Sequence, residues 1–479
     1  MDSPTVLIDK TVIPIGDEPN LLELIRKAGV ELPTFCYNPE LSIFGSCRMC
    51  MVEVGGRGIF PACSTTPENG IVIRTNTKQL RDLRKMILEL MLASHDQECT
   101  TCPKNGGCRL QSISKDLGVT EVRFKHMPQI VPKDHSSDAI ARDMSKCILC
   151  GDCVRVCDEK QSVRALNFTY RGIQARVMPA FNKPLADVEC VSCGQCIKAC
   201  PVGALTVTPS VPKVWAAIYD PQKTVVVQVA PAARKALSEA FGEESFAAGT
   251  GKSISALRLM GFDRVYDTDF SSEVVMGEVG KEYAKTDNKP LFTSTCPAWT
   301  AFVGYFYPDL PGTLSKCKSP QQMFGALCKD ILATQLDIAR DDLVVVSVMP
   351  CAAKKHEAAL DTDVDHVLTP EELTMMIEEA NIAWGELEQS AFDEPFTPPA
   401  SDDVVNGALR VVSDMLENEP ACYGVKTREV DIDGKTLKIA VVTGLANARE
   451  LIEKVKSGGE TYDLVKVMSC TDGCAHGRG

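Results

Sequence analysis

The spacing of cysteines constrains this chain more than any other feature. Of its 22 cysteines, fifteen lie from Cys36 to Cys200, most of them with only two or three residues between neighbours. Cysteines this close together cannot close a large loop as a disulfide, but they can bring several thiolates to one metal centre. We therefore predict a fold organised around metal clusters, with loop-closing disulfides as the weaker alternative.

Length and composition narrow the class of protein further. The 479 residues are enough for about three domains, and 44% hydrophobic with 24% charged residues is typical of globular chains. A net charge of −13 argues against binding to nucleic acid or an anionic membrane. The sequence has neither a bilayer-spanning apolar run nor a secretory signal at its start, so we expect a cytoplasmic protein that binds no membrane.

Residues 1–80 combine a predicted hairpin at 5–14, a helix at 20–29 and a strand at 51–54 with four cysteines in the pattern C-x10-C-x2-C-x12-C. These are Cys36, Cys47, Cys50 and Cys63. The spacing resembles that of the 2Fe-2S domain in the large hydrophilic subunit of complex I, and this resemblance implies a β-grasp fold with one 2Fe-2S cluster. Four thiolates alone also suit structural zinc.

Residues 81–135 carry one histidine and three cysteines in the pattern H-x3-C-x2-C-x5-C, after a predicted helix at 77–94. The set is His95, Cys99, Cys102 and Cys108. Because the three cysteines lack a fourth thiolate, we expect His95 to be the fourth ligand of either zinc or a 4Fe-4S cluster. The same pattern occurs in complex I and in hydrogenases, which implies the 4Fe-4S cluster.

Residues 136–212 contain two C-x2-C-x2-C-x3-C runs, the spacing of bacterial two-cluster ferredoxins. In such domains the fourth cysteine of each run binds the cluster of the other run. The predicted 4Fe-4S sets are Cys147, Cys150, Cys153 and Cys200 for one cluster, and Cys157, Cys190, Cys193 and Cys196 for the other. We expect an exit strand and a linker at 206–214.

Residues 213–479 change in character. Runs of β-branched residues at 224–229 and 343–348 alternate with helical stretches such as 321–334, which indicates α/β layers around a parallel sheet. An acidic, proline-bearing stretch at 386–403 is predicted to be a surface loop. Two cysteines after predicted strands and a C-x3-C pair could converge on a fourth 4Fe-4S cluster, namely Cys296, Cys351, Cys470 and Cys474.

The order of these motifs resembles the FeFe, or iron-only, hydrogenases. The resemblance rests on three motifs: T-S-x-C-P-x-W at 293–299, M-P-C-x-x-K at 349–354 and M-x-C-x-x-G-C at 468–474. The resemblance implies that the last four cysteines hold a cubane and that Cys474 bridges it to a di-iron unit bearing CO and cyanide. It further implies pocket positions around that unit at Ala230, Pro231, Ser319, Gln321, Met349, Lys354 and Met468.

Departures from the family argue against the di-iron unit. Thr295 stands where the family has a proton-carrying cysteine, and a hydroxyl with so high a pKa is a poor relay. Val279 falls at a second relay position. The family's glycine-rich pocket wall is replaced by the segment 398–410, and the sequence stops at 476–479 where the family usually continues.

We therefore predict an iron-sulfur electron-transfer subunit of a multi-subunit oxidoreductase, hydrogenase-like but without hydrogen chemistry. Its expected partners are flavin- and NAD(P)H-binding subunits, other iron-sulfur subunits and ferredoxin, since this chain has no G-x-G-x-x-G opening a βαβ unit. The alternative is an active or hydrogen-sensing FeFe hydrogenase that interconverts H2 with two protons and two electrons, with Thr295 beside the reacting centre.

Overall fold

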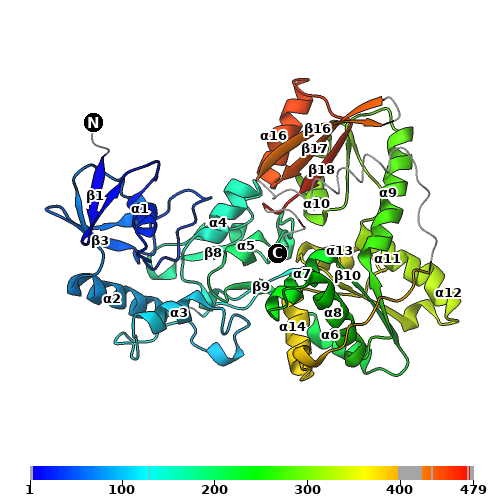
Figure 1. Cartoon of the computed structure of the whole chain (residues 1–479), viewed down its shortest axis with the longest axis horizontal. Coiled ribbons are helices and arrows are strands. Elements are labelled where there is room, and N and C mark those ends of the chain that lie inside the picture. Colours follow the sequence, from blue (N-terminus) through cyan, green and yellow to red (C-terminus); the bar gives the residue numbers. More distant parts are fainter. Residues whose placement is uncertain (1–3, 129, 397–422, 433–434, 472–473, 475–479) are drawn as a thin grey trace.

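A computed structural model describes residues 4–128, 130–396, 423–432, 435–471 and 474 (Figure 1). It shows a mixed α/β protein with three larger sheets and two short two-stranded ones. Among the described helices, none is long and apolar enough to cross a membrane.

The first sheet has the strand order β2-β1-β5-β3-β4. Its strands are β1 (Thr5–Ile8), β2 (Thr11–Pro14), β3 (Met51–Val54), β4 (Gly58–Pro61) and β5 (Val72–Arg74), and α1 (Leu21–Lys27) packs on it. The predicted hairpin pairs Ile8 with Thr11, and Asn20 begins α1 by accepting the Glu23 N–H at its side chain. The hairpin, helix and strand predicted for this segment are confirmed.

A long helix leads from this sheet to the next cysteine set. Helix α2 (Lys78–Ser94) begins at Thr77, whose side chain accepts the Leu80 N–H, and ends immediately before His95. Helix α3 (Arg109–Asp116) begins directly after Cys108. The end of α2 and the start of α3 therefore bring His95 and Cys108 to the same cavity.

The two-cluster segment contains little regular structure. Strands β6 (Ile140–Arg142) and β9 (Leu205–Val207) pair with each other, as do β7 (Asn167–Thr169) and β8 (Arg176–Met178). Helices α4 (Asp152–Arg155) and α5 (Gln195–Ala199) each begin at a left-handed glycine, Gly151 and Gly194, where a side chain would be strained. A wide turn at Val156–Lys160 extends α4.

The expected linker at 206–214 is wrong in its second half. Strand β9 ends at Val207, and helix α6 (Val211–Ile218) begins soon afterwards. Pro212 stands in the first turn of α6, where its missing N–H costs nothing. Val214 is fully buried against the following sheet, so burial holds this segment in a helix.

The C-terminal half contains two mainly parallel sheets. One has the order β11-β10-β14-β15, from β10 (Thr224–Val229), β11 (Arg264–Asp267), β14 (Leu343–Val348) and β15 (His366–Leu368). The other has the order β13-β12-β18-β17-β16, from β12 (Leu291–Phe292), β13 (Thr313–Leu314), β16 (Gly424–Ile432), β17 (Lys435–Thr443) and β18 (Leu464–Met468). The two predicted β-branched strands are confirmed at the residues expected.

Helices cover both sheets. They are α7 (Pro231–Ala240), α8 (Phe246–Met260), α9 (Thr268–Lys285), α10 (Pro297–Phe306), α11 (Pro320–Leu327), α12 (Ala333–Gln335), α13 (Ala353–Leu360), α14 (Pro370–Glu379) and α16 (Leu445–Lys456). The helical stretch expected at 321–334 is confirmed, with a π-type turn inside it at Cys328–Leu332. Cys328 is fully buried there, in the hydrophobic core.

The stretch predicted as a surface loop is anchored on the core over its described part. The Phe396 ring lies 5.3 Å from Tyr266 and 5.4 Å from Phe270, and Asp393 accepts the Val265 N–H at 2.7 Å. These aromatic contacts bind residues 392–396 to the core despite their polar neighbours. Residues 397–403 lie outside the described part of the chain, as does most of the segment 398–410.

Candidate metal centres

The first four cysteines form two close pairs. Cys36 and Cys47 have their sulfur atoms 3.3 Å apart, and each sulfur also accepts a backbone N–H, from Cys47 at 3.4 Å and Phe35 at 3.5 Å respectively. A hydrogen bond from Cys47 lowers the pKa of Cys36 to about 5, and one from Cys63 lowers the pKa of Cys50 to about 7. Four buried sulfurs, two of them readily ionised, suit metal ions that replace thiol protons.

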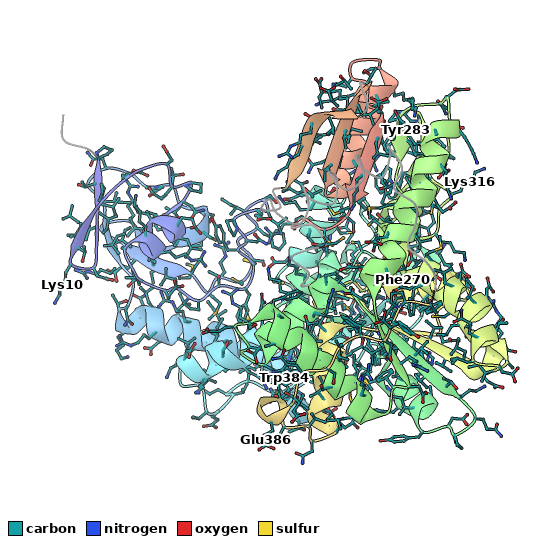
Figure 2. All side chains as sticks on the ribbon, turned by 45° about the vertical axis from the view of Figure 1, so that its right-hand side comes forward. Lys10, Phe270, Tyr283, Lys316, Trp384 and Glu386 are labelled. Carbon is teal, nitrogen blue, oxygen red and sulfur yellow. The ribbon has the colours of Figure 1, made fainter. Side chains whose placement is uncertain are left out.

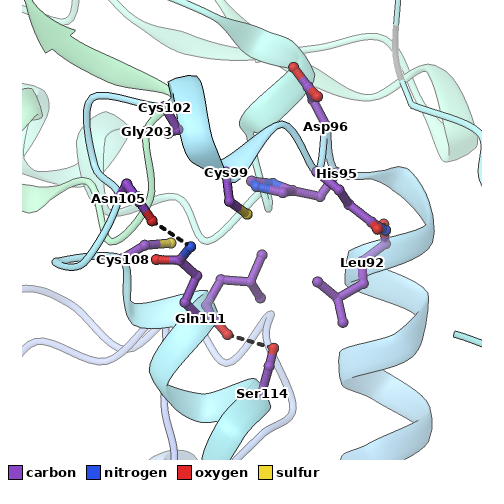
Figure 3. Close-up of a pocket in the computed structure, with 12 residues that line it drawn as sticks. Leu92, His95, Asp96, Cys99, Cys102, Asn105, Cys108, Gln111, Ser114 and Gly203 are labelled. Carbon is purple, nitrogen blue, oxygen red and sulfur yellow. Dashed lines mark hydrogen bonds between the residues drawn. The ribbon is translucent and has the colours of Figure 1, made fainter. Parts of the chain in front are cut away.

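His95, Cys99, Cys102 and Cys108 line one cavity of about 310 Å³ (Figure 3). The buried Nδ1 of His95 has no hydrogen-bond partner, and burial lowers the pKa of this imidazole, which keeps it in the neutral form that binds metals. Gly203 closes one side, where an added Cβ would lie 2.6 Å from the Cys102 sulfur. An unpartnered imidazole nitrogen and a glycine cradle fit a cluster in this cavity.

The two ferredoxin-type runs interleave in space. Ionised Cys200 would raise the pKa of Cys147 and Cys150, and ionised Cys157 would raise the pKa of Cys190 and Cys193, so each fourth cysteine lies beside the other run. Burial raises the pKa of all eight thiols and is the largest cause at each. Buried thiols with raised pKa values gain most from metal ions that stabilise the thiolate.

The four C-terminal cysteines also converge. Cys296 follows β12, Cys351 follows β14 and Cys470 follows β18, so the carboxyl ends of strands from two sheets supply three of them. Cys470 hydrogen-bonds to Cys351 and Cys474, which lowers the pKa of both and brings that of Cys474 to about 6. Burial raises the pKa of Cys296 to about 11, whereas the Cys474 residue is exposed.

Polar side chains beside this thiol set form one network. The Lys354 ammonium donates to the Thr295 carbonyl at 3.2 Å, the Ser319 hydroxyl at 2.9 Å and the Glu357 carboxylate at 2.9 Å. The Gln321 amide donates to the same carboxylate at 3.0 Å. The structure thus brings together the residues expected here and adds Glu357, which the sequence motifs did not single out although it lies one helical turn beyond Lys354.

The remaining expected pocket residues lie at the ends of strands. Ala230 and Pro231 follow β10, Met349 follows β14, and the Ala230 N–H donates to the Val348 carbonyl at 3.1 Å. Met468 ends β18 and is buried in an apolar cluster with Val279. Val279 therefore packs against hydrophobic side chains.

Contacts between residues near the cysteines connect the thiol sets. Arg155, next to the Cys153 turn, donates to the Cys36 carbonyl at 2.8 Å, and the Ser46 hydroxyl lies 3.5 Å from the Cys150 carbonyl. At the other end, the Gln161 amide donates to the Ser469 carbonyl at 2.9 Å, beside Cys470. An added Cβ on Gly194 would lie 3.1 Å from Ala352, beside Cys351. Sequence spacing gave no signal for these links.

Four known families match consecutive parts of the chain. Residues 5–78 match 2Fe-2S iron-sulfur cluster binding domains, and residues 84–123 match the NADH-ubiquinone oxidoreductase-G iron-sulfur binding region. Residues 137–206 match the ferredoxin-like domain of NADH-quinone oxidoreductase subunit 3. Residues 223–478 match the C-terminal domain of the iron only hydrogenase large subunit.

Individual proteins show the same similarity to iron-only hydrogenases and to NADH-quinone oxidoreductase subunits. The NADP-reducing hydrogenase subunit HndD of Solidesulfovibrio fructosivorans is 37% identical over 100% of this chain and 89% of its own. Iron hydrogenase 1 of Clostridium pasteurianum is 30% identical over 99% of this chain and 88% of its own. An NADH-quinone oxidoreductase subunit of Rhizobium meliloti is 37% identical over 42% of this chain and 23% of its own. The chain belongs to the iron-only hydrogenase large subunit family and is an oxidoreductase subunit with 2Fe-2S and 4Fe-4S domains.

Proposed function

We propose that the chain relays electrons through one 2Fe-2S cluster and four 4Fe-4S clusters. The 2Fe-2S cluster is held by Cys36, Cys47, Cys50 and Cys63. The 4Fe-4S clusters are held by His95 with Cys99, Cys102 and Cys108, by the two interleaved sets of the ferredoxin-like segment, and by Cys296, Cys351, Cys470 and Cys474. The run of contacts that joins these sets from Cys36 to Cys470 carries the proposal.

Electrons follow a branched path in this proposal. The 2Fe-2S loop touches the turn that carries Cys150 and Cys153 through Arg155 and Ser46. The cavity that contains His95 reaches the Cys200 turn, because Cys102 lies against Gly203. Both N-terminal sites thus approach the Cys147 set, from which the path continues through the Cys157 set to Cys470.

We further propose that the chain works in a hetero-oligomer in the cytoplasm. Two of the relatives named above are subunits, one of an NADP-reducing hydrogenase and one of an NADH-quinone oxidoreductase. A flavin- and NAD(P)H-binding subunit, further iron-sulfur subunits and ferredoxin are the partners that suit such a relay. The nicotinamide and flavin would bind to the partners.

The proposal assigns no hydrogen chemistry to the C-terminal site. Thr295 presents a hydroxyl where proton exchange needs a group that titrates near the working pH. Val279 is only 3% exposed and lies among apolar side chains, where no proton can be relayed. The thiolate ligands of the cubane are kept, whereas two groups needed to move protons are not.

Anaerobic potentiometric titration followed by electron paramagnetic resonance tests this function. The intact chain with its clusters assembled should contain about 18 iron atoms and show five reducible centres. Replacing Cys351 with Ala, which has no ligating atom, should remove the signal of one 4Fe-4S centre and leave the others. A signal set unchanged by that substitution would refute the assignment of the C-terminal cluster.

A second candidate function is an active or hydrogen-sensing hydrogenase. The observation that favours it is the network in which Lys354 contacts Ser319 and the Thr295 carbonyl beside the C-terminal thiols. Replacing Thr295 with Cys separates the candidates. Hydrogen turnover appearing in that variant would favour this second function, and no turnover in a fully assembled protein would favour the relay.

A further inference from the structure

The hairpin of β7 and β8 and the turn that follows it expose large apolar side chains. Phe181 is 92% exposed, Ile173 75% and Tyr170 53%. Natural surfaces rarely gather such residues without a binding role. At the base of the hairpin, by contrast, Val177 and Met178 are buried in the core that also contains Cys150 and Cys153.

The same segment is basic within an acidic protein. Between Leu166 and Leu185 the sequence has three cationic residues, Arg171, Arg176 and Lys183, and no acidic one, although the whole chain has a net charge of −13. Both Arg171 and Lys183 are exposed. Arginine and aromatic residues are the side chains that most often dominate protein interfaces.

Local contacts hold this surface in one arrangement. The Arg176 guanidinium lies 5.0 Å from the centre of the Tyr170 ring, and the Asn182 amide donates to the Tyr170 hydroxyl. Tyr170 and Phe181 have positive φ angles, 62° and 57°, which bulky residues rarely adopt. Such backbone conformations persist where the surrounding structure fixes them, often at binding surfaces. A surface that is already fixed loses little conformational entropy when a partner binds.

The hairpin stands directly over two of the proposed cluster loops. The Phe168 ring of β7 stacks on Phe44 with ring centres 5.5 Å apart, and Phe44 lies in the loop between Cys36 and Cys47. An added Cβ on Gly151, next to Cys150, would meet Phe44 at 2.9 Å and Phe168 at 3.2 Å. Val177 and Met178 of β8 also lie in one buried cluster with Cys153 of α4 and Cys196 of α5.

We propose that Tyr170, Arg171, Ile173, Arg176, Phe181 and Lys183 form the docking surface for a small acidic electron-carrier protein. Three exposed apolar side chains and three cations in one short segment match the small, charge-steered contacts of transient electron-transfer pairs. One electron passes between the carrier's centre and the cluster of the Cys147 set. One centre is oxidised, the other is reduced, and no bond or proton is exchanged. This inference rests on the proposed relay function and names its carrier and its surface.

The test uses the complete chain with its clusters assembled and a reduced bacterial 2[4Fe-4S] ferredoxin as the acidic probe. The variant Arg171→Glu/Lys183→Glu reverses the charge of the surface, and Phe181→Ala removes its most exposed apolar side chain. Lys10→Glu/Lys316→Glu is the control because it makes the same charge change at two exposed residues elsewhere, on the β1–β2 turn and near α9 (Figure 2). Stopped-flow absorbance measures cluster reduction, and methyl viologen serves as a small donor that needs no docking surface.

We expect ferredoxin to reduce the charge-reversed variant about tenfold more slowly than the wild type at low salt, as expected for lost electrostatic steering. Phe181→Ala should also slow it, while the control and all rates with methyl viologen stay unchanged. Wild-type rates with ferredoxin in the charge-reversed variant would overturn the inference, as would a permanently bound subunit that covers Phe181. If methyl viologen reduces no cluster even in the wild type, the relay function itself fails.

Discussion

Replacing Gln161 with Leu tests the link between the ferredoxin-like segment and the C-terminal site. Gln161 and Ser469 are both fully buried, and the Gln161 amide is the donor to the Ser469 carbonyl. Ser469 precedes Cys470 in the sequence, and its hydroxyl lies 3.6 Å from the Cys296 sulfur. The single side chain of Gln161 therefore connects the turn after Cys157 to a residue that touches two cysteines of the last set.

The substitution should change the free energy of unfolding only slightly, because two costs of burying an unpaired polar group offset each other. Leaving the Ser469 carbonyl buried and unpaired costs about 1–3 kcal/mol. Gln161 Oε1 is itself buried without a partner, so its removal returns a cost of similar size. Leu has nearly the same volume, so packing changes little. We expect the free energy of unfolding to change by no more than about 1 kcal/mol as these two terms offset each other.

The rate of electron transfer should fall, because a leucine side chain cannot replace the lost hydrogen bond between Gln161 and Ser469. Rapid-freeze electron paramagnetic resonance after photoreduction should show slower reduction of the C-terminal cluster in Gln161→Leu, at unchanged iron content. The matched control is Gln322→Leu. Gln322 is also buried with an unpartnered Oε1, and it donates to the Glu357 carbonyl at 3.1 Å, but this bond stays inside the C-terminal half. Equal transfer rates in the two variants would refute the reasoning.

Three further substitutions give sharp outcomes. His95→Ala should remove about four iron atoms and one 4Fe-4S signal, measured by iron analysis and electron paramagnetic resonance, because we propose its imidazole as the fourth ligand; unchanged iron would contradict this. Gly203→Ala should lower occupancy of the same cluster, since its new Cβ would meet Cys102 at 2.6 Å; the cluster's signal intensity checks it. Glu372→Gln should destabilise the fold by about 3–5 kcal/mol in denaturant titration, because buried Lys355, 2.7 Å from this carboxylate, would keep an uncompensated charge; a loss below about 1 kcal/mol would contradict it.

The sequence predicted well whatever depends on local pattern. The β-branched runs at 224–229 and 343–348 became β10 and β14 at the expected residues, because buried parallel strands need continuous apolar side chains. Thr77 and Asn20 marked helix starts, since their side chains cap the first turn. Which thiols share each cluster stays a prediction from the tight cysteine runs.

The sequence did not predict features that depend on contacts between residues far apart in the chain. Gln161 and Ser469 are 308 positions apart, and no periodicity connects them. Gly203 reads as an ordinary turn residue until Cys102 is seen against it. The stretch at 386–403 was predicted to be a surface loop, but its Phe396 packs against aromatic neighbours from β11 and α9. Each of these three features depends on tertiary packing, which local sequence patterns do not encode.

Infrared spectroscopy of the anaerobically matured protein tests the central claim most directly, because CO and cyanide bound to iron absorb where polypeptides do not. With about 18 iron atoms present per chain, the account predicts a spectrum without CO or cyanide bands. Such bands in the unmodified protein, accompanied by hydrogen evolution, would contradict it.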